Sequence, residues 1–146
     1  MKLGIITFHR AYNYGAFLQC YALSKYLSDV GFDVEVIDYF PSYFRQSYSL
    51  RMPNLKNKKG IKSKIATILE YALTVKTKSK RYAAFKRFYN YIPLSDTQYD
   101  EKSLDLKKYN IIIWGSDQVW NPKIIHNDKN FIASVPKNKG QKFVSY

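Results

Sequence analysis

Length and composition describe a chain that can bury a core of its own. It has 146 residues, of which 46% are hydrophobic and 24% charged, so we expect one packed domain and exclude global disorder. The net charge of +13 is uneven, because residues 42–92 hold 13 Lys and Arg against one acid, Glu70. The one cysteine, Cys20, excludes an internal disulfide, and no Cys/His cluster has the spacing of a zinc site.

The first elements predict a parallel pair of strands. Residues 2–8 form an apolar run typical of a strand buried on both faces. Helical spacing of apolar residues follows up to Val30, with Asn13 as the predicted N-cap and Gly31 as the predicted stop. Residues 33–39 predict a second strand. This order requires a right-handed crossover and a parallel sheet.

The basic segment comes next. Residues 42–60 are polar and lack a period, which predicts a loop or a mobile excursion. Apolar spacing predicts a helix over 61–75 and another over 82–92, which Pro93 ends. Residues 76–80 either join these helices or interrupt them.

The last third continues the sheet. Residues 104–109 predict a short turn of helix, and Ile111-Ile112-Ile113 predict a strand that is apolar on both faces. Residues 129–135 and 141–146 predict two further strands. The fold class is therefore α/β: a Rossmann-like parallel sheet with flanking helices, carrying a basic helical insertion at about 42–92.

The N-terminus and the hydropathy predict a cytoplasmic protein. The run at 2–8 is too short for the core of a signal peptide, and no small-residue cleavage site follows it. No segment approaches the ~18 apolar residues of a membrane-spanning helix.

Two loops that follow strands carry the candidate site residues. In parallel sheets, ligands bind at the carboxyl ends of the strands. The first loop runs from His9 to Gly15 and feeds a helix N-terminus, where an anion is favoured and where His9 and Arg10 could add charge. The alternative is an ordinary turn capped by Asn13, with Tyr14 packing and His9 as a hydrogen-bonded structural residue.

The second loop is Gly115-Ser116-Asp117-Gln118-Val119-Trp120-Asn121. Ser116 and Asp117 come just after a strand, where α/β enzymes place polar working groups. The alternative is structural, with Asp117 capping a short helix and Trp120 plugging the core. Asn121-Pro122 favours a turn.

Other motifs are missing from the sequence. No G-x-G-x-x-G follows the first strand, although Asp38 ends the second strand where a ribose-binding acid would lie, and no P-loop is present. His126 has no partner at metal spacing, and Cys20 is interpreted as a buried apolar residue. We expect no metal and no cofactor.

The basic segment has three interpretations. It is a solvated, mobile excursion, or it contacts an anionic membrane surface or a lipid-linked phosphate substrate, or it binds nucleic acid. Nucleic acid is not expected, because no recognised nucleic-acid module accompanies the charge.

Ordered motifs across nearly the whole chain resemble the polysaccharide pyruvyl transferase family. The most specific block is Gly115-Ser116-Asp117-Gln118-Val119-Trp120-Asn121-Pro122. The other matching stretches are Gly4 to Arg10, Asn13-Tyr14-Gly15-Ala16 with Leu18-Gln19 and Tyr21-Ala22-Leu23, Val34 to Tyr39, and the spacing of Phe85 and Phe88 in a basic helix.

The resemblance implies a function. Such enzymes have two Rossmann-type domains in a GT-B-like arrangement and transfer a pyruvyl group from phosphoenolpyruvate to sugar hydroxyls, forming a ketal in a cell-wall polysaccharide or exopolysaccharide. It therefore implies cytosolic work in surface-glycan assembly, with phosphoenolpyruvate and a glycan, free or lipid-linked, as partners.

The resemblance also implies which residues are missing. Family members are considerably longer, and their phosphoenolpyruvate-binding Arg and His residues lie mainly in a second domain. We therefore expect residues 1–146 to be an incomplete N-terminal domain that is inactive alone and prone to self-association. No catalytic residue carries over. The residues that do carry over are expected to hold the acceptor or shape the cleft: Asn13, Tyr14, Gly15, Gly115, Ser116, Asp117, Trp120 and Asn121.

Two other functions stay open from the sequence. One is a glycosyltransferase that uses a nucleotide-sugar, since a crevice between two domains suits it equally well. The other is a non-catalytic module that binds an anionic surface through residues 42–92.

Overall fold

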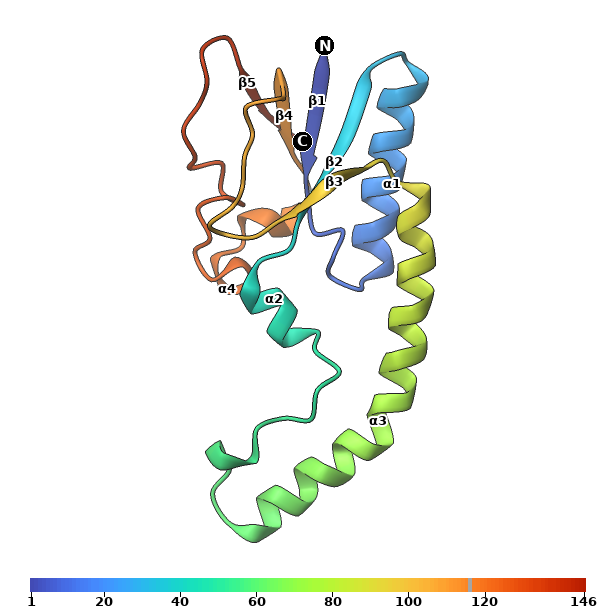
Figure 1. Ribbon diagram of the computed structural model, residues 1–146, viewed down its shortest axis with the longest axis vertical. Coiled ribbons are helices and arrows are strands. Elements are labelled where there is room, and N and C mark those ends of the chain that lie inside the picture. Colours follow the sequence, from blue (N-terminus) through green and yellow to red (C-terminus); the bar gives the residue numbers. More distant parts are fainter. Residues whose placement is uncertain (116) are drawn as a thin grey trace.

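Five strands pair into one parallel sheet with the strand order β3-β2-β1-β4-β5, in which β1, β2 and β4 are largely buried (Figure 1). The computed structural model describes residues 1–115 and 117–146. The strands are β1 (Lys2–Ile6), β2 (Asp33–Tyr39), β3 (Leu94–Tyr99), β4 (Ile111–Trp114) and β5 (Lys142–Ser145). The helices are α1 (Tyr14–Asp29), α2 (Ser42–Ser47), α3 (Ile61–Phe88) and α4 (Pro122–Ile125), with 3-10 turns η1 (Leu55–Asn57), η2 (Tyr89–Tyr91) and η3 (Asp117–Trp120).

All neighbouring strands are parallel, which confirms the predicted Rossmann-like α/β fold. Parallel strands need cover on both faces, and the central ones are accordingly apolar on both. Ile5, Ile6 and Ile112 are fully buried in β1 and β4. Asn13 and Gly31 bound α1 as predicted, and Gly31 takes a φ of 93° just beyond the helix.

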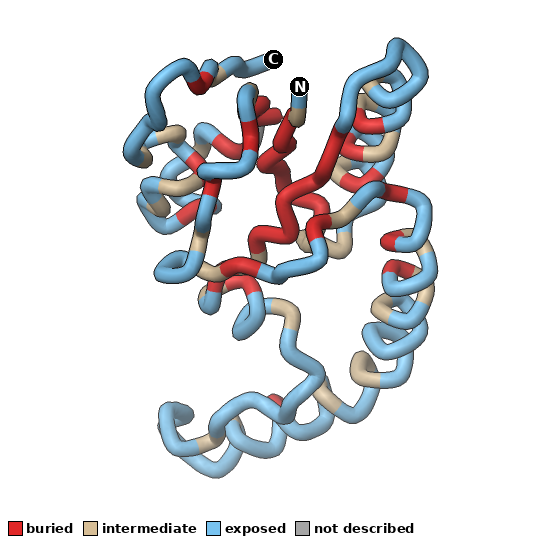
Figure 2. Tube along the Cα trace, turned by 45° about the horizontal axis from the view of Figure 1, so that its top comes forward, coloured by how far each residue is buried: buried red, intermediate tan, exposed pale blue. Residues whose placement is uncertain are grey.

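The buried residues concentrate in the sheet and the segments against it (Figure 2), and they form two clusters. Phe17 and Cys20 of α1 and Phe85 of α3 cover one face. Phe44 of α2 and Phe131 belong to the cluster on the other face, which also contains residues of η3 and α4. Burial raises the pKa of the Cys20 thiol to about 12, which confirms its interpretation as a buried apolar residue.

Helix α3 is continuous, so residues 76–80 join the two predicted helices. Its 28 residues give a length of about 42 Å. Its C-terminal end packs on the sheet, whereas its N-terminal part extends beyond it together with the segment that follows α2 (Figure 1). No helix in the described part of the chain has both the length and the apolarity needed to cross a membrane.

The prediction of a loop at 42–60 was wrong at its start, where α2 forms. Phe44 is buried and its ring lies 5.4 Å from that of Phe8, while Ser42 donates its backbone N–H to Glu101 at 2.9 Å. Contacts from distant parts of the chain therefore stabilise a helix that local periodicity does not indicate.

Two other predicted elements are absent from the structure as described. Residues 104–109 form no helix, because Asp105 accepts a hydrogen bond from the N–H of Lys107 in a local turn. Residues 129–135 form turns instead of a strand: the Asp128 carboxylate accepts from the N–H of Asn130, and Ala133 has a φ of 56°. The sequence did not predict strand β3.

Candidate functional site

The loops that follow β1 and β4 meet at the carboxyl edge of the sheet. Ile6 pairs with Trp114, so the two strands finish side by side. The chain leaves β1 for α1, whose Phe17 joins the core of one face, and leaves β4 for η3, whose Val119 joins the core of the other. Connections that leave to opposite faces define the switch point where α/β proteins bind ligands. The structure brings the two predicted loops to this point.

The first loop presents the N-terminus of α1. Asn13 caps the helix, because its Oδ1 accepts the backbone N–H of Ala16 at 3.1 Å. Asn13, Tyr14 and Gly15 are all exposed, and the Tyr14 ring lies 4.9 Å from that of Phe85. The first N–H groups of a helix lack intrahelical partners and favour an anion. The structural reading of Asn13 and Tyr14 is thus correct, and the helix end still faces solvent.

His9 and Arg10 are engaged with Asp38 inside the protein. The His9 ring is buried, with Nε2 lying 3.2 Å from Oδ1 of Asp38 and Nδ1 lying 3.2 Å from the carbonyl oxygen of Thr7. Arg10 donates from Nε to Asp38 Oδ1 at 2.6 Å and from a terminal nitrogen to the other oxygen. The Arg10 guanidinium also lies 4.3 Å above the Tyr89 ring. An incoming anion would compete with Asp38 for the Arg10 guanidinium.

The electrostatics of this cluster oppose proton uptake. Burial lowers the pKa of His9, and the Arg10 charge lowers it further against the effect of Asp38. Burial alone would raise the pKa of Asp38, but hydrogen bonds from His9 and Arg10 hold it far below its ordinary value. A neutral His9 ring can donate to only one of its two acceptors. The cluster therefore holds a permanent carboxylate and a guanidinium, which suits a structural role for His9.

Two residues of β3 complete this cluster, and the sequence did not identify them. Gln98 donates from Nε2 to Asp38 Oδ2 at 3.0 Å, and Ser95 accepts the backbone N–H of Asp38 at 2.9 Å. Strand β3 has polar residues at most positions, so it carries no hydrophobic period. The carboxylate of Asp38, which the sequence placed at the end of β2, is thus hydrogen-bonded to residues within the domain.

The second loop divides between burial and exposure. Val119 is fully buried and is the residue that plugs the core, whereas Trp120 is 41% exposed. The structural alternative in which Trp120 plugs the core is therefore wrong. Asn121 accepts the N–H of Lys123 at 3.1 Å and caps α4. Ser116 lies outside the described residues, as do the side chains of Asp117 and Gln118.

Gly115 lies in close contact with the Tyr146 ring at this edge. It donates its backbone N–H to Ile6 at 3.0 Å. A Cβ at this position would lie 2.2 Å from Cε1 of Tyr146, so a side chain here forces that ring to move. The lack of a side chain at Gly115 thus leaves room for the half-exposed Tyr146 ring between the ends of β4 and β5.

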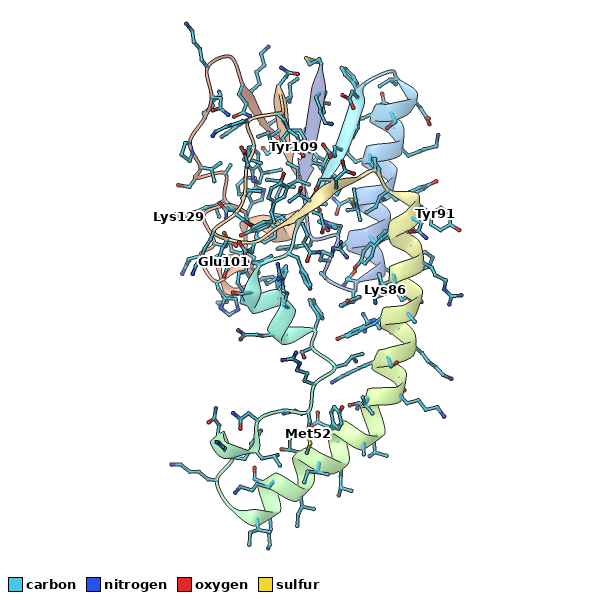
Figure 3. All side chains as sticks on the ribbon, viewed as in Figure 1. Met52, Lys86, Tyr91, Glu101, Tyr109 and Lys129 are labelled. Atoms are coloured by element: carbon cyan, nitrogen blue, oxygen red, sulfur yellow. The ribbon has the colours of Figure 1, made fainter. Side chains whose placement is uncertain are left out.

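A groove of about 470 Å³, lined by polar and apolar side chains, lies beside the ends of β2 and β3. Tyr39 and Tyr43 both donate their hydroxyls to Oδ2 of Asp128. Burial and the Asp128 charge raise the pKa of both tyrosines. Figure 3 shows Glu101 and Lys129 at this side of the sheet. Sequence analysis missed the groove because its lining comes from segments far apart in the chain: Tyr43, Glu101, His126, Asp128, Lys129, Asn130, Ser134, Val135 and Pro136.

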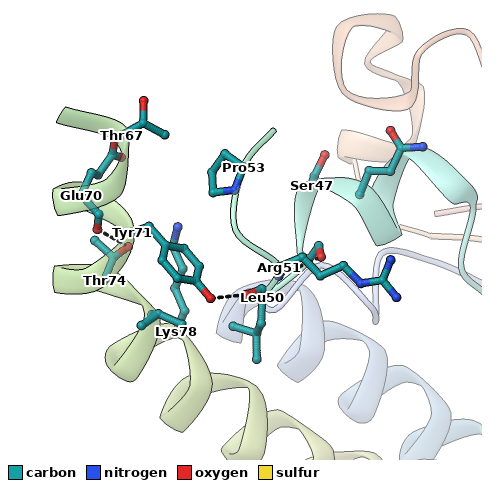
Figure 4. Close-up of a pocket in the computed structure, with 12 residues that line it drawn as sticks. Ser47, Leu50, Arg51, Pro53, Thr67, Glu70, Tyr71, Thr74 and Lys78 are labelled. Carbon is teal, nitrogen blue, oxygen red and sulfur yellow. Dashed lines mark hydrogen bonds between the residues drawn. The ribbon is translucent and has the colours of Figure 1, made fainter. Parts of the chain in front are cut away.

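A second hollow lies away from the carboxyl edge, between α3 and the segment after α2 (Figure 4). It measures about 260 Å³, and Tyr71 donates its hydroxyl across it to the carbonyl oxygen of Leu50 at 3.0 Å. Its position separates it from the strand-end loops. Among the residues that the structure describes, no group of three or more His, Cys, Asp or Glu could hold a metal ion.

The chain matches one family model over almost all its length. The model, described as polysaccharide pyruvyl transferase, matches residues 13–146. The match includes both strand-end loops apart from residues 9–12. A search of curated proteins and a search of solved structures each found no match.

Proposed function

The chain belongs to the polysaccharide pyruvyl transferase family, and from this premise we propose that it serves in pyruvyl transfer from phosphoenolpyruvate to a sugar hydroxyl of a surface polysaccharide. The observation that carries the proposal is the family match over residues 13–146. The position of the α1 N-terminus and of the loop after β4 at one switch point supports it.

The proposed reaction forms a ketal. The methylene carbon of phosphoenolpyruvate takes a proton and becomes a methyl group. Two sugar oxygens bond to the central carbon, its bond to the phosphate oxygen breaks, and inorganic phosphate leaves. One hydroxyl proton balances the methyl group and the other balances the phosphate.

We propose that the described residues hold the acceptor. Trp120 is 41% exposed and Tyr14 is 53% exposed at this edge. An aromatic ring with an accessible face suits the apolar face of a sugar, and polar groups beside it fix orientation. Gly115 and Asn121 shape the backbone around Trp120. Ser116 and Asp117 join this proposal from the sequence alone.

We further propose that residues 1–146 do not complete the reaction by themselves. Arg10 is held by Asp38, and burial lowers the pKa of His9, so neither is suited to protonate phosphoenolpyruvate. The resemblance assigns the cationic groups to a second domain in a GT-B-like arrangement. The described domain then supplies one wall of the cleft.

The test compares the chain of residues 1–146 with the product of the complete reading frame that encodes it. Both are mixed with phosphoenolpyruvate and a polysaccharide repeat unit, and ketal is followed by NMR together with phosphate release. We expect the complete product to form ketal and residues 1–146 to bind the repeat unit without turnover. Ketal from residues 1–146 would contradict the incompleteness, and consumption of a nucleotide-sugar instead would replace the proposed reaction with glycosyl transfer.

Trp120 gives the sharper residue test. Trp120→Ala should weaken binding of the repeat unit about tenfold, or ~1.4 kcal/mol, whereas Trp120→Phe should retain most of it. Calorimetry measures both. Tyr26→Ala is the matched control, since Tyr26 is 65% exposed on the outer side of α1. Equal binding by Trp120→Ala and the control would remove Trp120 from the acceptor site.

A further inference from the structure

The N-terminal part of α3 turns its aliphatic side chains to solvent. Five of them are widely exposed, at fractions of 76% for Ile61, 51% for Ile65, 41% for Ile68, 57% for Leu69 and 79% for Leu73. At 100° per residue these positions fall on one side of the helix. We call them the aliphatic face of α3.

The opposite side of the same helix is polar and faces inward. Thr67, Glu70, Tyr71 and Thr74 line the hollow between α3 and the segment after α2 (Figure 4). Thr67 is buried there, and Tyr71 is bonded to Leu50. A surface helix of a globular protein usually points its apolar stripe at the core. Here the orientation is reversed, so the domain itself does not cover the aliphatic face.

Positive charge surrounds the aliphatic face. Residues 42–92 hold 13 Lys and Arg and one acid, and that acid, Glu70, lies on the inward side. Lys62, Lys76 and Lys80 are exposed on the helix itself. Met52 lies beside this part of α3 (Figure 3) and is 43% exposed. Apolar side chains within a field of lysines are the pattern of helices that lie in the surface of an anionic bilayer.

We propose that the aliphatic face of α3 docks on a bilayer of anionic phospholipid, with the helix lying in the plane of the interface. Ile and Leu side chains enter the boundary between headgroups and acyl chains. The lysine stems lie along them and place their ammonium groups against lipid phosphates. The proposal does not depend on the transferase chemistry, although docking would bring the strand-end loops near a lipid-linked acceptor.

Charge and chemistry favour a bilayer over a second copy of the chain and over nucleic acid, and the test separates it from cover by the second domain proposed above. A second copy of the chain would bring two strongly basic segments together, which repel each other. Nucleic acid attracts the lysines but offers no surface on which five aliphatic side chains are buried. An anionic bilayer satisfies both features at once.

The first test is co-sedimentation of vesicles with residues 1–146 and, separately, with the product of the complete reading frame. Binding by residues 1–146 but not by the complete product would mean that the second domain covers the aliphatic face, and it would overturn the proposal. We expect binding to vesicles of mixed phosphatidylglycerol and phosphatidylcholine and none to phosphatidylcholine alone. The double variant Leu69→Ser with Leu73→Ser should lower the partition coefficient more than tenfold. Neutralisation to Gln should lower it about fivefold for each of Lys62, Lys76 and Lys80. Leu18→Ser is the matched control, because Leu18 is 60% exposed on α1.

The second test reports where the helix sits. An environment-sensitive dye is attached to Leu73→Cys or, as a control, to Leu18→Cys, while buried Cys20 stays unlabelled. We expect a blue shift with anionic vesicles at position 73 alone. The proposal is overturned by absence of vesicle binding, or by wild-type binding in the double serine variant. It is equally overturned by a lipid-free dimer that the serine variant abolishes, or by oligonucleotide binding that the serine variant retains.

Discussion

Aliphatic and charged side chains are buried and paired in the sheet, whereas in the first part of α3 they are exposed and unpaired among the described residues. In the sheet, Ile5 and Ile112 are fully buried, and Asp38 is matched with Arg10 and His9. In α3, Ile61 and Leu73 are three-quarters or more exposed. Every ion pair found among the described residues lies outside residues 42–92.

The contrast indicates that the sheet residues serve the stability of the fold and that the exposed residues of α3 serve an interaction. Burial and pairing in the sheet are accounted for by stability, because the apolar side chains and most of the buried polar groups have partners inside the domain. Exposed aliphatics and unmatched lysines on α3 contribute nothing comparable to the stability of the domain. A partner outside the domain would account for these residues, and the proposed bilayer surface contacts both the aliphatic side chains and the lysines.

The largest expected effect is on the free energy of unfolding, and two substitutions in the same helix test the contrast. Phe85 of α3 is fully buried among Tyr12, Tyr14 and Phe17, whereas Leu73 is 79% exposed. Phe85→Ala should lower the free energy of unfolding by about 3–5 kcal/mol through the cavity it leaves. Leu73→Ala should change it by less than about 0.5 kcal/mol. Urea unfolding measures both, and similar losses would mean that the aliphatic face is packed in solution.

The buried cluster of His9 and Asp38 predicts that the free energy of unfolding depends on pH, an effect of intermediate size. The folded His9 has a lowered pKa, so below about 6.5 the unfolded chain takes up a proton that the folded chain does not. The free energy of unfolding should therefore fall with decreasing pH by up to about 1.4 kcal/mol per unit from this residue. Asp38, whose folded pKa is also lowered, adds a loss only at more acidic pH.

Two histidine variants isolate this effect in urea unfolding across pH. His9→Gln should flatten the slope between mildly acidic and neutral pH. His126→Gln is the matched control, because His126 is exposed, and it should leave the slope as it is. A slope that survives His9→Gln would assign the dependence to other groups and would show that His9 is protonated in the folded chain.

The periodicity of apolar residues predicted the elements whose structure is determined by their local sequence. Strands β1 and β4 are apolar runs, β2 alternates apolar residues with Glu35 and Asp38, and α1 has both its cap and its stop in the sequence. The prediction failed where a distant contact decides. Strand β3 is polar and becomes a strand because its backbone pairs with β2. Phe131 leads a segment that packs on Phe8 and Tyr39 as turns rather than as a strand.

The candidate site could be located from the sequence but not resolved into roles. The rule that ligands bind at strand ends placed both loops correctly at one edge. The partners of His9 and Arg10 could not be foreseen, since Asp38 lies 28 residues beyond Arg10 and Gln98 lies 60 residues beyond Asp38. The choice between Val119 and Trp120 as the buried residue depends on how η3 turns, which composition does not determine.

The smallest predicted effect on the free energy of unfolding concerns the N-terminal caps of the two long helices. Helix α1 starts at Asn13, whose Oδ1 accepts the N–H of Ala16, whereas α3 starts at Gly60 with no side-chain cap among the contacts described. Asn13→Ala should lower the free energy of unfolding by about 1 kcal/mol, and Asn13→Asp should largely retain it, because the carboxylate accepts the same bond and opposes the helix dipole favourably. Thermal and urea unfolding measure the pair. If Asn13→Ala unfolds like the wild type while repeat-unit binding falls, Asn13 acts on the ligand rather than on the helix. If stability alone falls, it is a cap, and the acceptor contacts are limited to the neighbouring Tyr14 and the loop after β4.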